Sequence, residues 1–158
     1  MQEAHTTRTI HATPEQVWNL VSDLRTVQQY NPTVTSVDLL TDAAGGLGAQ
    51  RRCHFADGTD VREEIIASDE GQRLRLSLSE FSLPMKQLES EITLAPTADG
   101  KTQVTFTIAY DMKLGLLGRA MGATVVHHQL GKATAKMVAG MAHHLATGEE
   151  VGPDFKAA

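Results

Sequence analysis

The chain has 158 residues, of which 41% are hydrophobic and 21% are charged, so it can bury a substantial core and is too apolar to remain disordered. Its formal net charge of -5 gives no electrostatic reason to expect nucleic acid or an anionic membrane as a partner. Residues 1–5 have neither a basic start nor an apolar run, and no stretch approaches the roughly 20 apolar residues of a membrane span, so we expect neither a secretory signal nor stable membrane insertion.

The first part of the chain predicts one strand and two short helices. Residues 7–11 are rich in β-branched side chains and predict a short strand. Thr13 and Pro14 form a helix start, in which a hydroxyl cap precedes proline at the first helical position. The apolar residues that follow at helical spacing are Val17, Leu20, Val21 and Leu24. A second short helix, over about 27–30, ends at the Asn-Pro pair of residues 31–32.

Between residues 33 and 113 apolar residues recur at every second position, which predicts strands. Turn signals divide this region into about six strands, and they lie at Gly45-Gly46, Asp57-Gly58, Glu70-Gly71 and Ala98-Asp99-Gly100, with a softer break at Leu83-Pro84. Within the predicted strands apolar side chains alternate with polar ones, so each strand has one apolar face. This pattern is typical of an antiparallel sheet that is covered on one side only.

The last predicted element is a long helix from about residue 116 to 147, with a bend near Gly118 and Gly122. At about 100° per residue, one of its faces carries the apolar residues Val126, Leu130, Ala133, Met137 and Met141. A helix with such a face packs against the covered side of the sheet. The order of elements predicts one α+β domain over residues 1–158, with a strongly curved sheet.

Five short segments are informative as an ordered set: ATPEQVWNLVSD at 12–23, YNP at 30–32, GAQR at 48–51, GTDVRE at 58–63 and LP at 83–84. In this order they resemble the START-like (SRPBCC) superfamily, and specifically its polyketide cyclase/dehydrase-like branch. The resemblance spans nearly the whole chain. It implies a helix-grip fold, in which a curved seven-stranded antiparallel sheet wraps around the long C-terminal helix, with two short helices between strands 1 and 2. The family includes lipid carriers, hormone receptors and aromatase/cyclases, so the resemblance leaves the function open.

Arg51 and Glu63 are the most informative pair of polar residues. Arg51 has the same parity as the apolar Cys53, and Glu63 has the parity of the apolar residues of its own strand, so both side chains point inward. A three-residue turn at 56–58, with its glycine in the left-handed conformation, places them directly opposite each other. An ion pair on the inner face must be hydrogen-bonded or hydrated, because a lone buried charge is costly. It is therefore either a polar anchor for a ligand's carbonyl, hydroxyl or carboxylate, or a self-satisfied ion pair near the mouth of the grip.

Other residues complete the predicted pocket. Tyr30, Asn31 and Tyr110 are candidates for side chains whose polar groups face the cavity. A buried tyrosine hydroxyl needs a hydrogen-bond partner, which either a ligand or a backbone carbonyl can supply. Methionine suits a flexible apolar lining, although at helical spacing it is equally typical of plain core. Together with Arg51 and Glu63, the predicted ligand-binding residues are Tyr30, Leu76, Phe81, Met85, Phe106, Tyr110, Met121, Val126, Leu130 and Met137.

The sequence predicts no metal site and no cofactor. Among its seven histidines are two adjacent pairs, at 127–128 and 143–144. On one helix these pairs lie roughly 24 Å apart, too far to share a metal, so we expect solvated histidines. The chain has no nucleophile elbow, phosphate-binding glycine loop or metalloprotease helix. Its single cysteine, Cys53, suits a reducing compartment and, facing inward, should be inert, so we expect a cytoplasmic protein.

These observations favour a binding or carrier domain that encloses a small hydrophobic or aromatic metabolite, lipid- or polyketide-like, between the sheet and the C-terminal helix. Loops near Pro84 and the bend at 118–122 would gate the pocket. One alternative is a polyketide cyclase/aromatase-type enzyme that uses the same pocket, with Glu63 as its acid or base. Another is an accessory protein-interaction domain, which an exposed apolar patch on the outer face of the sheet would favour. The sequence makes no prediction of the oligomeric state.

Overall fold

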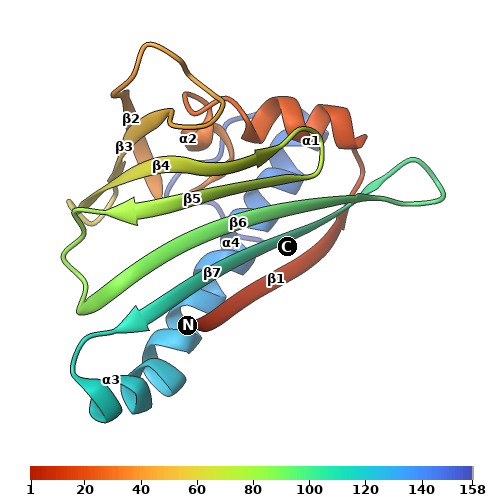
Figure 1. The fold of residues 1–158 in the computed structure, drawn as a ribbon. Helices are drawn as coiled ribbons and strands as arrows, with labels where there is room; N and C mark the ends of the chain where they lie inside the picture. Colours follow the sequence, from red (N-terminus) through yellow and green to blue (C-terminus); the bar gives the residue numbers. More distant parts are fainter. Residues whose placement is uncertain (158) are drawn as a thin grey trace.

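The structure is a computed structural model that describes residues 1–157. A curved sheet covers the long C-terminal helix on one side, and two short helices lie at one end of the sheet (Figure 1). The predicted α+β helix-grip arrangement, with seven antiparallel strands and two short helices between the first and second, is confirmed.

The sheet is fully antiparallel, in the order β1-β7-β6-β5-β4-β3-β2. Its strands are β1 (Gln2–Ile10), β2 (Val34–Leu39), β3 (Gln50–Phe55), β4 (Asp60–Asp69), β5 (Arg73–Ser79), β6 (Met85–Pro96) and β7 (Thr102–Met112). β1 begins earlier than its β-branched residues predict, because every residue from Gln2 to Ile10 pairs with β7. The ladder of backbone hydrogen bonds, rather than local propensity, sets where this edge strand starts.

The two short helices, α1 (Pro14–Val21) and α2 (Val27–Tyr30), form where they are predicted. At the start of α1, the Gln16 amide donates to the Thr13 hydroxyl at 3.2 Å, and the Gln16 side chain accepts from the Thr13 amide at 2.9 Å. This capping box satisfies two backbone groups that a helix start would otherwise leave unpaired. α1 buries Val17, Leu20 and Val21 against the core.

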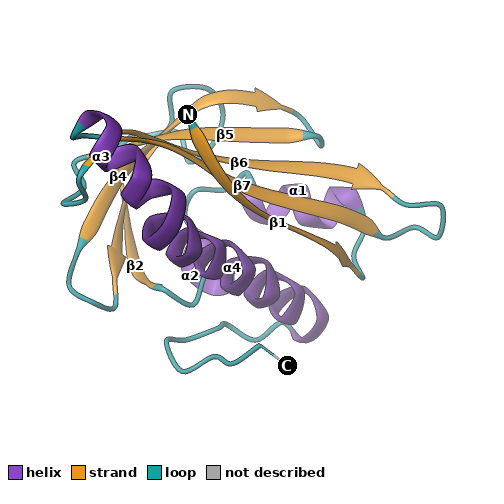
Figure 2. Cartoon of the chain, turned by 90° about the horizontal axis from the view of Figure 1, so that it is seen from below, coloured by secondary structure: helices purple, strands orange, loops and turns teal. Residues whose placement is uncertain are grey.

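The predicted C-terminal helix is divided into three segments. They are α3 (Gly115–Met121), a π-helical turn η1 (Gly122–Val126) and α4 (His127–Thr147). The π turn lies at the predicted bend, and it changes the phase of the helix by widening one turn. α4 lies along the inner face of the sheet, whereas α3 projects beyond the sheet's edge (Figure 2).

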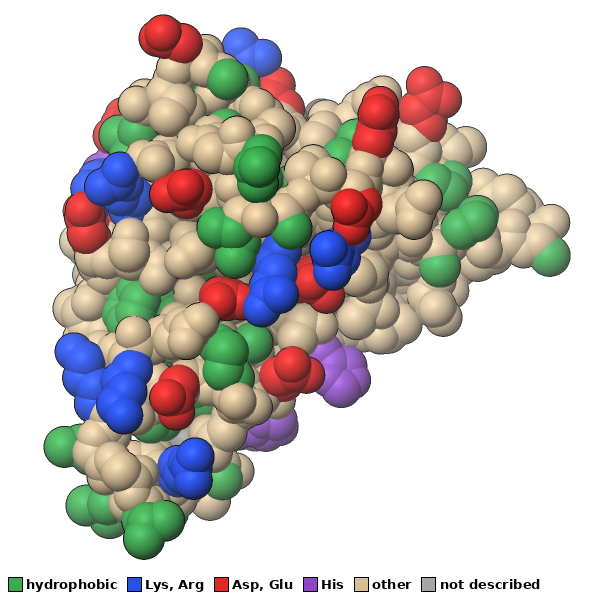
Figure 3. Space-filling model, in the orientation of Figure 1, with side chains coloured by type: hydrophobic (Ala, Val, Ile, Leu, Met, Phe, Trp, Pro, Cys, Tyr) green, Lys and Arg blue, Asp and Glu red, His purple; other side chains and the backbone are tan. Residues whose placement is uncertain are grey.

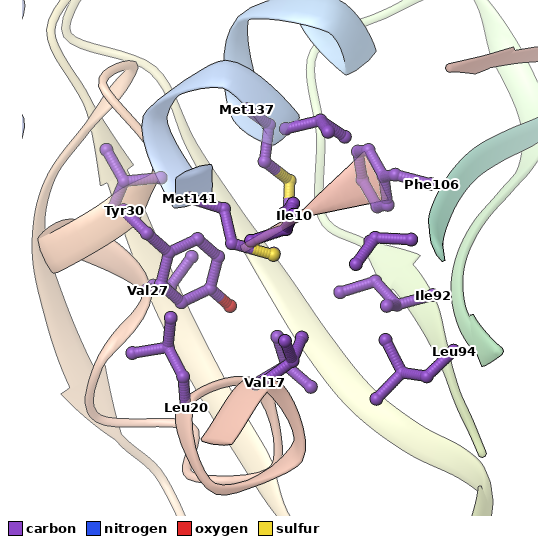
Figure 4. Packing of buried hydrophobic residues seen from close by; sticks show 14 of the residues in the cluster. Ile10, Val17, Leu20, Val27, Tyr30, Ile92, Leu94, Phe106, Met137 and Met141 are labelled. Carbon is purple, nitrogen blue, oxygen red and sulfur yellow. The ribbon is translucent and has the colours of Figure 1, made fainter. Parts of the chain in front are cut away.

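The main core lies between α1, α2, α4 and the central strands. Figure 4 shows Met137 and Met141 of α4 pointing between Phe106 and Ile92 on the sheet side and Tyr30 on the α2 side. Met141 and Tyr30 are almost completely buried. Packing of α4 therefore fixes α2 at one end of the sheet, where the cavity described below begins.

A candidate ligand-binding cavity

A cavity of about 370 Å³ lies between the inner face of the sheet, α2 and α4. Its volume falls within the roughly 300–1,000 Å³ that is usual for small-molecule sites. Most of its lining is aliphatic or aromatic, and its walls include Leu78, Ile92 and Ile108. The side chains at its inner end are buried, so a ligand there would be removed from water.

Most of the predicted pocket residues line this cavity, namely Tyr30, Arg51, Glu63, Leu76, Phe81, Phe106, Leu130 and Met137, together with Asn31. Whether they bind a ligand remains a prediction. They come from α2, α4, four strands and two loops, so only the folded sheet and helix bring them together.

Four predicted pocket residues lie outside the cavity. Tyr110 and Met85 do not line the cavity but pack with Met112 and with Leu88, whose side chain forms part of the cavity wall. Val126 is half-buried against this cluster. Met121 is 44% exposed on α3, which projects past the end of β7 (Figure 1). Strand parity and helical spacing define a face but not how far along the element the cavity reaches.

Several wall residues are absent from the predicted set although the sequence carries a signal for them. Ile108 has the parity of Phe106, and Leu78 has the parity of Leu76, so the same alternation predicts that both face inward. The cavity mouth had no comparable signal, because its residues, Asp57, Thr59, Ser82 and Leu83, come from turns and loops. Only tertiary structure places those turns beside one another.

The β3–β4 hairpin positions the polar residues of the inner end. Gly58 has a φ of +86°, which closes the predicted three-residue turn, with the Phe55 amide bonded to the Thr59 carbonyl at 2.8 Å. In the resulting register Arg51 lies directly opposite Glu63. The predicted pairing is confirmed.

Arg51 and Glu63 form a buried ion pair. Arg51 Nε donates to Glu63 Oε2 at 2.5 Å, and the two side chains are only 7% and 11% exposed. Arg51 Nη1 donates to the Leu24 carbonyl at 3.2 Å, which ties β3 to the segment after α1. Cys53 Sγ also donates to Glu63 Oε2, at 3.5 Å. Each charge is therefore held by specific partners, as burial requires.

Burial and this ion pair perturb the neighbouring pKa values. Burial raises the pKa of Tyr30 to about 12, although the Arg51 guanidinium opposes part of the rise. Burial and the Glu63 carboxylate both raise the pKa of the Cys53 thiol. Burial disfavours the Arg51 charge, but Glu63 more than compensates, with smaller contributions from Cys53 and Tyr30, so the pKa of Arg51 is raised. Tyr30 and Cys53 are therefore neutral at physiological pH.

The mouth of the cavity lies between the β3–β4 turn and the β5–β6 loop, which are on the same side of the molecule (Figure 1). Leu83 of the β5–β6 loop is 47% exposed there. Among the described side chains of residues 115–126, none lines the cavity. The loop near Pro84 thus lies beside the opening, whereas the bend at 118–122 does not.

The histidines lie away from the cavity. His127 and His128 are exposed, as predicted, but His143 is half-buried against the Phe155 ring, with 5.3 Å between ring centroids. His144 Nδ1 donates to the Glu149 carbonyl at 2.7 Å. The C-terminal segment therefore covers a pair that was expected to be solvated. Within residues 1–157, no three His, Cys, Asp or Glu side chains gather as a metal site would require.

Solved structures share this architecture. A START superfamily protein from Mycobacterium smegmatis superposes with a TM-score of 0.74 at 16% identity, over 91% of this chain and 98% of the other. A protein from Thermus thermophilus gives 0.71 at 22% identity, over 93% and 99%. DynU16, from the dynemicin biosynthetic locus, gives 0.73 at 22% identity, over 99% of this chain and 51% of its own. At these identities the likeness shows the fold alone.

The curved antiparallel sheet around the C-terminal helix, with a cavity between them, is a helix-grip fold. The family described as "Polyketide cyclase / dehydrase and lipid transport" matches residues 1–146, and the chain belongs to this family. The resemblance carried by the five sequence segments is therefore confirmed. No curated protein sequence matches the chain. Along the described part of the chain, none of the helices has the length and apolarity needed to cross a membrane.

Proposed function

We propose that residues 1–158 form a binding or carrier domain that encloses a small hydrophobic or aromatic metabolite, of lipid- or polyketide-like character. The observation that carries this proposal is the cavity of about 370 Å³, with apolar walls and a buried ion pair at its inner end. In such a site the apolar walls supply affinity and the polar pair supplies orientation. We place the protein in the cytoplasm, because its free cysteine, Cys53, suits a reducing compartment.

The family supports this class of ligand. Its description includes lipid transport as well as polyketide cyclisation, and both kinds of molecule are largely apolar. DynU16, which shares the fold, comes from a biosynthetic locus. These relations favour a hydrophobic metabolite and leave its identity to experiment.

Binding is favoured over acid–base catalysis by the protonation states at the inner end of the cavity. A general acid or base works best when its pKa lies near the operating pH. The pKa values of Tyr30, Cys53 and Arg51 are all shifted upward, away from neutrality. Glu63 remains the candidate base for a cyclase, but one of its oxygens already accepts hydrogen bonds from Arg51 and Cys53. These groups suit fixed hydrogen bonding better than proton transfer.

Filling the cavity tests the proposal. Titration with the neutral fluorescent probe N-phenyl-1-naphthylamine should show saturable binding at one site per chain. Met137→Trp should abolish binding, because Met137 lines the cavity and the larger ring would occupy it. Met121→Trp is the matched control, since Met121 is 44% exposed and lies outside the cavity. Circular dichroism of each variant checks that the fold survives. Unchanged probe binding by a folded Met137→Trp variant would place the ligand elsewhere.

A further inference from the structure

We infer that the cavity selects an uncharged ligand that carries a hydroxyl group, such as an alcohol, phenol or enol, and discriminates against carboxylates. This inference rests on the proposed function, because it names the ligand class of the same site. It is carried by the unshared oxygen of Glu63 and by the balance of charges along the cavity wall.

The two oxygens of the Glu63 carboxylate have different surroundings. Oε2 accepts hydrogen bonds from Arg51 Nε and Cys53 Sγ. Oε1 accepts none from the residues that the structure describes, yet it is not among the buried polar atoms that lack both a partner and solvent access. Since Glu63 lines the cavity, Oε1 is an acceptor that a ligand can reach. A ligand hydroxyl can donate to it, whereas a ligand carboxylate has no proton to donate.

Arg51 can complete the recognition of a hydroxyl group. A guanidinium carries five N–H donors. Two of them donate to Glu63 and to the Leu24 carbonyl, and the Tyr30 hydroxyl and the Cys53 sulfur also interact with the group, so at least one donor remains for a ligand. A hydroxyl both donates and accepts, so it can interact with the Glu63 acceptor and a remaining Arg51 donor together. Because the Arg51 charge is already balanced by Glu63, Arg51 offers a hydrogen bond without offering a net charge.

The rest of the cavity wall provides no compensation for an anion. Among the described residues that line it, Arg51 is the only Lys or Arg, whereas Glu63, Asp57 and Asp60 are carboxylates, of which Asp60 pairs with Arg52 of the outer face. Tyr30 and Cys53 are neutral, because burial raises their pKa values. A carboxylate ligand would therefore be desolvated next to Glu63 without a free cation to receive it. An ammonium ligand can donate to Glu63 but cannot accept a hydrogen bond from Arg51, and its own charge would be desolvated beside a carboxylate that Arg51 already neutralises.

Displacement of N-phenyl-1-naphthylamine by four matched compounds tests the selectivity at neutral pH. The compounds are naphthalene, 2-naphthol, 2-naphthoate and 2-naphthylmethylamine, which differ chiefly in the attached group. We expect 2-naphthol to bind about tenfold more tightly than each of the others, the difference that one satisfied buried hydrogen bond makes. Equal or tighter binding of 2-naphthoate or of the amine would overturn the inference while leaving the carrier proposal intact. If the probe itself does not bind, both fail.

Glu63→Gln provides the decisive variant. It removes the negative charge beside Arg51 and keeps the shape of the side chain, so 2-naphthoate should gain about tenfold relative to 2-naphthol. Glu80→Gln is the control, because Glu80 pairs with Arg52 on the outer face. This substitution should leave the order of the four affinities unchanged. Retained probe binding reports that each variant is folded. If Glu63→Gln is folded and still prefers 2-naphthol to the same degree, Glu63 does not set the selectivity. If it does not fold, the wild-type series alone decides the inference.

Discussion

Arg51 and Arg52 follow one another in β3, but they face opposite sides of the sheet. Arg51 lies inside the cavity with Glu63, where the two side chains are 7% and 11% exposed. Arg52 lies outside and pairs with Glu80, where the exposed fractions are 27% and 49%. Both arginines thus form ion pairs, and the curvature of the sheet gives them different surroundings.

The difference shows that the contribution of an ion pair to stability and to ligand recognition depends on how far its charges are removed from water. On the outer face, positive and negative side chains lie interspersed (Figure 3), and at the pairs of Glu80 with Arg52 and Arg62 water can solvate a charge whose partner is lost. Such pairs contribute little to stability. Inside the cavity, a charge without its partner cannot recover its hydration, so the pair must remain intact or be replaced as a unit. The inner pair can therefore specify a ligand, whereas the outer pairs mainly keep the surface polar.

The largest expected effect comes from breaking the inner pair. Glu63→Ala leaves the buried Arg51 charge uncompensated and should lower the free energy of unfolding by about 3–5 kcal/mol. Glu80→Ala, the outer counterpart, should cause little change, because both of its arginine partners remain accessible to water. Urea denaturation of both variants measures the difference. Equal destabilisation would show that the face of the sheet does not matter.

The two faces of α4 offer a second comparison, between Gly140 and Gly131. A Cβ atom at Gly140 would lie 2.2 Å from the Tyr30 carbonyl oxygen, so Gly140→Ala must push α4 away from α2 and should cost about 1–3 kcal/mol. A Cβ atom at Gly131 would meet nothing within 4 Å. Gly131→Ala should therefore raise stability by about 0.5–1 kcal/mol through helix propensity. Thermal unfolding should shift in opposite directions, and a shift in the same direction for both would contradict the close packing of α4 on α2.

The last effect concerns the buried Tyr30 hydroxyl and appears only at high pH. Its pKa rises from 10.0 to about 12 on folding, mainly through burial, so the folded state holds this proton more tightly than the unfolded state. The stability that this provides is complete below pH 10 and is lost as the pH rises through 12. Urea midpoints between these values should fall less steeply for Tyr30→Phe than for the wild type. Parallel curves would mean that Tyr30 ionises equally in both states.

The sequence predicted the inner pair because a local signal determined it. The alternation around Cys53 placed Arg51 on the inner face, and of the two turns that could end at Gly58 only the three-residue one sets an inward Glu63 opposite Arg51. Capping residues likewise predicted α1 correctly, from Thr13 and Gln16. In each case the responsible interaction spans few residues, so it can be deduced without knowing the rest of the fold.

The extent of the cavity could not be predicted in this way. Tyr110 has the correct parity, but it lies beyond the cavity and packs against Met85 and Met112. Helical spacing predicts Met121 in the pocket only if the helix lies over the sheet from its first turn, whereas α3 projects past the end of β7 (Figure 1). How far the cavity extends along a strand, and how much of the C-terminal helix lies over the sheet, depend on the curvature of the whole sheet. Local sequence patterns do not encode that curvature.

The central claim is that a small apolar ligand binds between the sheet and α4, and methionine methyl NMR tests it most directly. The chain has six methionines, of which Met137 lines the cavity and Met121 lies exposed on α3. During titration with 2-naphthol, we predict that the Met137 methyl resonance shifts and saturates, whereas the Met1 and Met121 resonances stay unchanged. A shift at Met121 with none at Met137 would place binding on the exposed surface of α3 and contradict the account.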